Sequence, residues 1–175
     1  MRKIFHFFIY ALLAILVVLI DLSFLQALPW EIYRLQLTVI VLVFLRLFAD
    51  EKIWLWWLAG AGYLLEIFSF MTFGLHILAL SLAALAAHYL LLRWVTNRSV
   101  YAAALAVVVA VLFYDGVFWL YDYFFSASND PVVFETSFMA QLRALCYNGL
   151  LGAIIFYLIN LLTKRFSPVF LRKFT

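Results

Sequence analysis

Only one of the 175 residues is a cysteine, which excludes a disulfide within the chain and a multi-cysteine metal cluster. Charged residues make up 12% of the chain, whereas soluble domains average about 25%. Proline occurs 3 times and glycine 6 times, so few residues interrupt regular structure. These shortages exclude an ordinary soluble globule, a disordered chain and a nucleic-acid-binding module. Hydrophobic residues fill 69% of the sequence instead, and this composition predicts a polytopic membrane protein.

Long apolar stretches between charge clusters predict six membrane-spanning helices in a single transmembrane domain, residues 1–175. A span needs about 20 mostly apolar residues to cross a hydrocarbon core of about 30 Å. Residues 53–92 are too long for one span, so we expect the chain to turn back between Ser69 and Gly74. The runs lack the alternating polarity of barrel strands, which predicts an all-α bundle. The predicted spans are about 4–28, 35–49, 53–70, 74–92, 100–125 and 138–163.

The positions of Lys and Arg predict that both termini face the cytoplasm. With six spans and an inner N-terminus, ten basic residues lie on the inner side and only Arg34 and Arg143 on the outer side. The net charge of +3 is then explained by topology and by contact with anionic lipid, without a nucleic-acid partner.

Small residues recur at helical spacing in the third to sixth spans, for example Ala79, Ala83 and Ala87. Helices in lipid pack closely where such residues let their backbones approach. We therefore expect spans three to six to form a close-packed centre, with spans one and two more exposed to lipid.

Charged groups inside the predicted spans are costly to bury, and most of them fall in the outer half of the bundle. In a structural interpretation, Arg143 pairs with Asp122 or Glu66, while Asp21 and Asp115 are neutral or satisfied by neighbours. In a functional interpretation, the groups line an outward-facing polar cavity for a ligand, or a polar patch for a partner helix. The candidate intramembrane site comprises Asp21, Glu66, Ser69, Gly74, His76, Asp115, Asp122 and Arg143.

The sequence does not predict an enzyme. Its three histidines, His6, His76 and His88, lack the spacing of metal ligands, so we expect no metal site and no cofactor. Tyr114-Asp115 is similar to half of the signature of intramembrane aspartyl proteases, but the other half is absent. No Ser–His pair is placed for nucleophilic catalysis.

Residues 60–82 carry a family resemblance. They contain a glycine, the acidic Glu66, then Ser69, a bend that ends in Phe73-Gly74, and Leu78-Ala79-Leu80-Ser81. This pattern resembles the MreD family of bacterial rod shape-determining proteins. Further matches are Leu25-Gln26 ahead of Pro29, and Asp115 with Phe118-Trp119. The chain departs from the family pattern at Glu66, where aspartate is usual, and at Thr72, where proline is frequent.

The resemblance implies a non-enzymatic, multi-pass subunit of the cell-elongation machinery in the bacterial cytoplasmic (inner) membrane. Its implied partners are an MreC-like bitopic membrane protein, the elongation glycosyltransferase with its transpeptidase, MreB filaments and the lipid bilayer. The alternative is the small-molecule-binding S subunit of an energy-coupling-factor type vitamin transporter. Such subunits are similarly small and six-spanning, and the outer polar groups would suit a solute.

Overall fold

The computed structural model describes residues 2–25, 27, 34–48, 51–69, 72–93, 99–125 and 131–170, and within these ranges it is all-helical, without strands. Three helical stretches, Leu75–Arg93, Val100–Phe125 and Met139–Leu162, are long and apolar enough to cross a membrane. The elements in chain order are α1 (Arg2–Leu19), the π-helical turn η1 (Ile20–Leu25), α2 (Leu37–Phe48), α3 (Glu51–Ser69), α4 (Leu75–Arg93), α5 (Val100–Phe125) and α6 (Pro131–Phe170).

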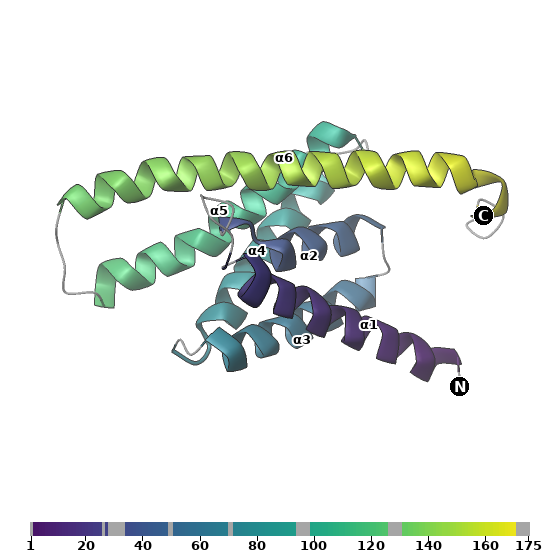
Figure 1. Cartoon of the computed structure of the whole chain (residues 1–175), viewed down its shortest axis with the longest axis horizontal. Coiled ribbons are helices and arrows are strands. Elements are labelled where there is room, and N and C mark those ends of the chain that lie inside the picture. The colour runs from purple at the N-terminus through teal and green to yellow at the C-terminus, as the bar shows by residue number, and fades with distance from the viewer. Residues whose placement is uncertain are drawn as a thin grey trace.

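Both ends of the helical bundle are recognisable in Figure 1. Helix α1 begins and α6 ends at the same end of the molecule, and the ends of α3 and α5 and the starts of α4 and α6 lie at the opposite end. Helix α6 runs the length of the molecule as one continuous rod.

Helices α4, α5 and α6 pack closely through small residues, as predicted. On α4, Ala79 and Ala83 are completely buried, and on α5 the same holds for Ala106 and Ala110. Gly152 of α6 lies against Val107 of α5. Because alanine and glycine carry so little side chain, the backbones of these helices approach one another closely.

The predicted exposure of the first two spans is half right. Helix α1 does expose large apolar side chains, such as Leu12 and Leu16. Helix α2, by contrast, lies inside the bundle, where it contacts α1, α3, α4 and α5. Half of its 12 residues are buried. The prediction for α2 was wrong because lipid and protein interior are equally apolar, so a Leu- and Val-rich sequence does not say which of them it faces.

Except for α6, the helices begin and end within about three residues of the predicted spans. Helix α5 has the predicted bounds, whereas η1 ends at Leu25, before the predicted end of the first span at 28. Helix α6 is much longer than the predicted 138–163. It begins at Pro131, and proline suits a first helical position because its fixed φ is already helical and no N–H is needed there.

Candidate functional site

The N-terminus of α2 lies within the bundle. With 12 residues α2 is about 18 Å long, which is shorter than the hydrocarbon core of a bilayer. Residues 35 and 36, directly ahead of it, are not helical. Non-helical backbone at membrane depth is tolerated only where protein satisfies its polar groups. Helix α2 can therefore begin there only if the polar backbone groups of residues 35 and 36 and its own first N–H groups find hydrogen-bond partners within the protein.

Asp21 caps the start of α2 from the π-helical turn. Its Oδ1 accepts a hydrogen bond from the Leu37 backbone N–H (3.2 Å). Its Oδ2 accepts from the Thr38 N–H (3.0 Å) and from the Thr38 hydroxyl (2.6 Å). The first N–H groups of a helix have no partner within the helix and favour an anion, so this carboxylate has a structural role.

Asn148 of α6 holds the residues that precede α2. Its side chain is completely buried. The amide oxygen accepts from the Gln36 N–H (2.9 Å), and the amide nitrogen donates to the carbonyls of Arg34 (3.0 Å) and Ala144 (2.9 Å). Sequence reasoning did not include this residue among the candidates. An amide within an apolar helix was a usable signal, since uncharged polar groups there also need partners.

Glu66 caps α4 in the same way that Asp21 caps α2. Its carboxylate accepts hydrogen bonds from the backbone N–H groups of Gly74 and His76, the latter at 3.0 Å. Gly74 has a φ of 100°, a backbone conformation that residues with a side chain rarely adopt. Glu66 and Gly74 thus form one structural unit that turns the chain from α3 into α4.

His76 links this turn to α5. Its Nδ1 lies 2.8 Å from the Tyr114 hydroxyl, and its ring packs on Phe118 with centroids 4.9 Å apart. The other ring nitrogen, Nε2, is buried and has no hydrogen-bond partner among the described residues. The same is true of the Ser69 hydroxyl at the end of α3.

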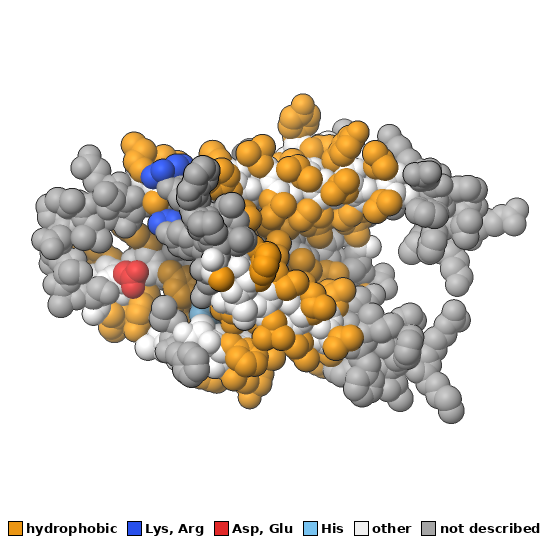
Figure 2. All heavy atoms as spheres, viewed as in Figure 1, with side chains coloured by type: hydrophobic (Ala, Val, Ile, Leu, Met, Phe, Trp, Pro, Cys, Tyr) orange, Lys and Arg blue, Asp and Glu red, His pale blue; other side chains and the backbone are white. Residues whose placement is uncertain are grey.

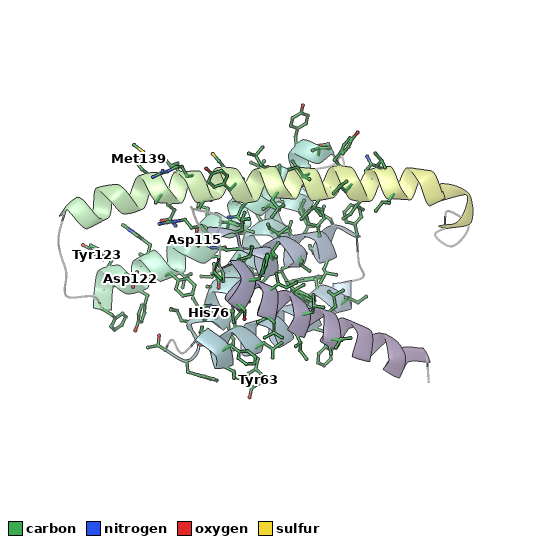
Figure 3. The ribbon with its side chains drawn as sticks, in the orientation of Figure 1. Tyr63, His76, Asp115, Asp122, Tyr123 and Met139 are labelled. Carbon is green, nitrogen blue, oxygen red and sulfur yellow. The ribbon has the colours of Figure 1, made fainter. Side chains whose placement is uncertain are left out.

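A polar cavity of about 390 Å³ lies between α5, α6 and the segment before α2. Asp115 is central to it and accepts hydrogen bonds from the side chains of Gln36 and Gln141. Figure 3 shows Asp115 between α5 and α6, and Asp122 nearer the end of α5. The cavity is lined by Arg34, Gln36, Asp115, Phe118, Trp119, Asp122, Gln141 and Ala144.

Arg143 is exposed and does not line this cavity. Its Nε donates to the Met139 carbonyl one turn earlier on α6, at 3.4 Å. Both oxygens of Glu66, one of its two predicted partners, are engaged by backbone amides. The pairing of Arg143 with Asp122 stays a prediction.

A second polar cluster joins the C-terminal ends of α2 and α4. Arg46 Nε donates to His88 Nδ1 at 2.7 Å. The Trp54 ring packs on both, with its centroid 5.8 Å from the His88 ring and 5.9 Å from the Arg46 guanidinium carbon. The Arg46 guanidinium thus has a hydrogen-bond acceptor and an aromatic face beside it, and near the C-terminus of α2 it also interacts favourably with the helix dipole.

An apolar groove of about 410 Å³ runs between α1 and α3. Gly60 lies in it, and a Cβ added there would meet nothing within 4 Å. The groove is lined by Ala11, Ala14, Ile53, Trp56, Trp57, Ala59, Gly60 and Tyr63.

The eight predicted site residues thus fall into separate groups. Asp21 caps α2. Glu66, Gly74 and His76 form the turn between α3 and α4, and Ser69 lies at the end of α3 beside it. Asp115 and Asp122 line the polar cavity, and Arg143 lies outside it. The lining residues Arg34, Gln36 and Gln141 were not among the candidates: Arg34 precedes the predicted second span, and Gln36 and Gln141 are uncharged residues near the starts of the predicted spans 35–49 and 138–163. The cavity combines two carboxylates, a guanidinium, two amides and aromatic rings, which suits binding of a polar ligand.

No group of three or more His, Cys, Asp or Glu side chains that could hold a metal ion occurs among the described residues. Comparisons of the chain with protein-family models, with curated proteins and with solved structures find no match.

Proposed function

We propose that the chain crosses the bacterial inner membrane six times, with both termini in the cytoplasm. Three helices have the length and apolarity for a crossing. The common end of α1 and α6 in Figure 1 supports an even number of crossings. The contact between Arg46 and His88 joins the C-terminal ends of α2 and α4, as the predicted inner positions of Arg46 and Arg93 require. Arg34 lines the cavity beside Asp115 and Asp122, at the opposite end.

We propose further that the protein is a non-enzymatic subunit of the cell-elongation machinery. It would act through helix contacts with an MreC-like partner and the peptidoglycan synthases. The observation that carries this proposal is the α3–α4 turn: the residues of the MreD-like pattern, Glu66 and Gly74, work there as one unit. Apolar side chains also gather over the middle of the face seen in Figure 2, a surface suited to lipid and to partner helices.

Affinity purification in a mild detergent tests this function. The tagged full-length chain is purified from a rod-shaped bacterium that encodes it, and the bound proteins and small molecules are both identified. We expect an MreC-like protein in stoichiometric amount. A stoichiometric vitamin-like solute without an MreC-like protein would overturn the proposal.

The polar cavity favours a second candidate, the S subunit of an energy-coupling-factor type vitamin transporter. Its volume of about 390 Å³ is within the usual range for small-molecule sites. In that case the same purification would yield the solute, and the ATPase subunits of the transporter would replace the MreC-like protein.

A further inference from the structure

Arg46 carries a charge that no carboxylate of the described residues neutralises. Its contacts within that part of the chain are the hydrogen bond from Nε to His88 and the packing against the Trp54 ring. His88 Nδ1 accepts this hydrogen bond, so the ring is neutral and cancels no charge. The group formed by Arg46, His88 and Trp54, called the inner arginine cluster below, therefore keeps the full positive charge of the guanidinium.

Most hydrogen-bond donors of Arg46 remain available. A guanidinium has five N–H donors and no acceptor, and among the described residues only the Nε–H of Arg46 has a partner. The side chain is half-buried. None of the described polar atoms that are buried without a partner belongs to it, so its two Nη atoms reach the surface. Their four N–H groups form a planar fork that can donate to an anion outside the protein.

Three helices hold this guanidinium in place. His88 of α4 accepts from Nε at 2.7 Å, and the Trp54 ring of α3 lies 5.9 Å from the guanidinium carbon. The Trp54 and His88 rings are stacked on each other, with centroids 5.8 Å apart. A side chain that is already fixed loses little conformational entropy when it binds a ligand. Phosphate oxygens match the geometry of such a fixed fork.

The inner arginine cluster lies close to the inner boundary of the membrane in the proposed topology. Arg46 lies two residues before the end of α2, Trp54 three residues after the start of α3, and His88 five residues before the end of α4. These offsets are about 3, 5 and 8 Å along the helix axes. An unpaired cation just inside the hydrocarbon core is costly, and the phosphates of the lipid headgroups are the nearest anions.

The charge on this side of the protein favours lipids with a net negative charge. In the proposed topology the inner side carries ten basic residues and only two acidic ones, Asp50 and Glu51. Arg93, in the last turn of α4, is exposed and lies over the Tyr89 ring, with its guanidinium carbon 5.4 Å from the centroid. Such an excess of basic residues attracts anionic lipids more strongly than zwitterionic ones.

From these observations we propose that the inner arginine cluster binds a phosphate group, which is supplied by the headgroup of an anionic lipid in the inner leaflet. The phosphate oxygens accept hydrogen bonds from the Nη groups of Arg46. His88 and Trp54 position the guanidinium and do not touch the lipid phosphate. The site depends on the proposed membrane topology, which reporter fusions test separately, and does not depend on the proposed role in cell elongation.

Native mass spectrometry of the full-length protein in a mild detergent tests the proposal. The protein is incubated with phosphatidylglycerol or with phosphatidylcholine of the same acyl chains, and separately with inorganic phosphate. We expect phosphatidylglycerol to be retained about tenfold more than phosphatidylcholine. Binding of inorganic phosphate without a lipid preference would also support the site, with free phosphate as its ligand. Equal retention of both lipids without binding of inorganic phosphate would overturn it.

Two charge variants assign the binding to the cluster. Arg46→Gln should reduce the retention of phosphatidylglycerol about tenfold. Arg93→Gln removes the same charge from the same side of the protein but outside the cluster, and should change retention by less than about twofold. Size-exclusion profiles identical to that of the parent protein confirm that each variant is folded. Equal losses in the two variants would show a general attraction between this side and anionic lipid, and would refute the site.

Two variants of His88 leave the charge of Arg46 in place and test how it is positioned. His88→Phe removes the acceptor of the Arg46 Nε–H and should lower retention of phosphatidylglycerol about fivefold. His88→Asn keeps a side-chain acceptor and should restore most of the retention. Retention by His88→Phe equal to that of the parent protein would refute the fixed guanidinium as the binding group.

Discussion

Gly149 and Gly152 allow α6 to approach α5 more closely than any larger residue would. A Cβ built at Gly149 lies 2.7 Å from Val108 Cγ2, and one at Gly152 lies 3.0 Å from Val107 Cγ2. Valine has essentially one rotamer in a helix, so neither side chain can turn away. Shape complementarity at single residues therefore holds these two helices together in an environment without a hydrophobic driving force between them.

The substitution Gly149→Ala should destabilise the protein by about 1–3 kcal/mol, because its new methyl group collides with Val108. Thermal unfolding in detergent, followed by size-exclusion chromatography, measures the effect. Gly116→Ala on α5 is the matched control, since a Cβ there meets nothing within 4 Å, and its melting temperature should not fall. Adding Val108→Ala to Gly149→Ala should restore part of the lost stability. Equal melting of Gly149→Ala and Gly116→Ala would contradict the close approach.

The polar side chains of this protein separate into structural and binding groups only when their partners are known. Sequence analysis predicted that Asp21, Glu66 and Asp115 need partners, and it raised the possibility of a polar cavity. It did not find Asn148 or Gln36, since an uncharged amide gives a weak signal and the residues that these amides contact on other elements lie more than 70 residues away along the chain.

At the level of the helices, two of them begin at a carboxylate supplied by the preceding element. Asp21 precedes α2 by 16 residues, and Glu66 lies on α3, eight residues before Gly74. In water, solvent could satisfy the first N–H groups of α2 and α4. In the proposed membrane topology water does not reach these groups, and the two carboxylates accept their hydrogen bonds instead.

Replacing Asp21 by alanine should lower stability by about 1–2 kcal/mol, the usual cost of removing a helix cap. The Leu37 and Thr38 N–H groups then lose their acceptor. Asp21→Asn keeps one acceptor oxygen and should lie between the parent protein and Asp21→Ala. Chemical denaturation in mixed micelles gives this ranking, and an Asp21→Ala protein as stable as the parent would show that the cap is dispensable.

The substitution Glu66→Ala should loosen the first turn of α4 without unfolding the bundle. Hydrogen–deuterium exchange of the amides of Gly74 and His76 should become faster, since both lose their acceptor. Exchange in α6 serves as the internal control and should not change. Protection of both amides at the parental level would show that another group caps the helix.

The apolar pattern predicted the helices well because a membrane span needs a fixed length, and α5 has the predicted bounds of 100–125. The pattern could not predict the position of α2 in the bundle, because apolar residues that face lipid and apolar residues that face protein look the same in the sequence. Nor did it predict the full length of α6, since residues 126–137 were assigned to a linker.

For the whole molecule, the proposed topology predicts the outcome of reporter fusions. A periplasm-dependent enzyme such as alkaline phosphatase should be inactive when fused after Thr175 and active when inserted between α5 and α6, after 128. A cytoplasm-dependent fluorescent protein should give the opposite result. Phosphatase activity at the C-terminal fusion would exclude a cytoplasmic C-terminus and with it the proposed topology.

Helix α6 has consequences outside the bilayer. Its 40 residues amount to about 60 Å, whereas its apolar stretch Met139–Leu162 covers about 36 Å. One eight-residue length of helix, about 12 Å, therefore continues beyond that stretch on each side. In the proposed topology this helix protrudes from both membrane surfaces, so a sideways pull on one end tilts the other.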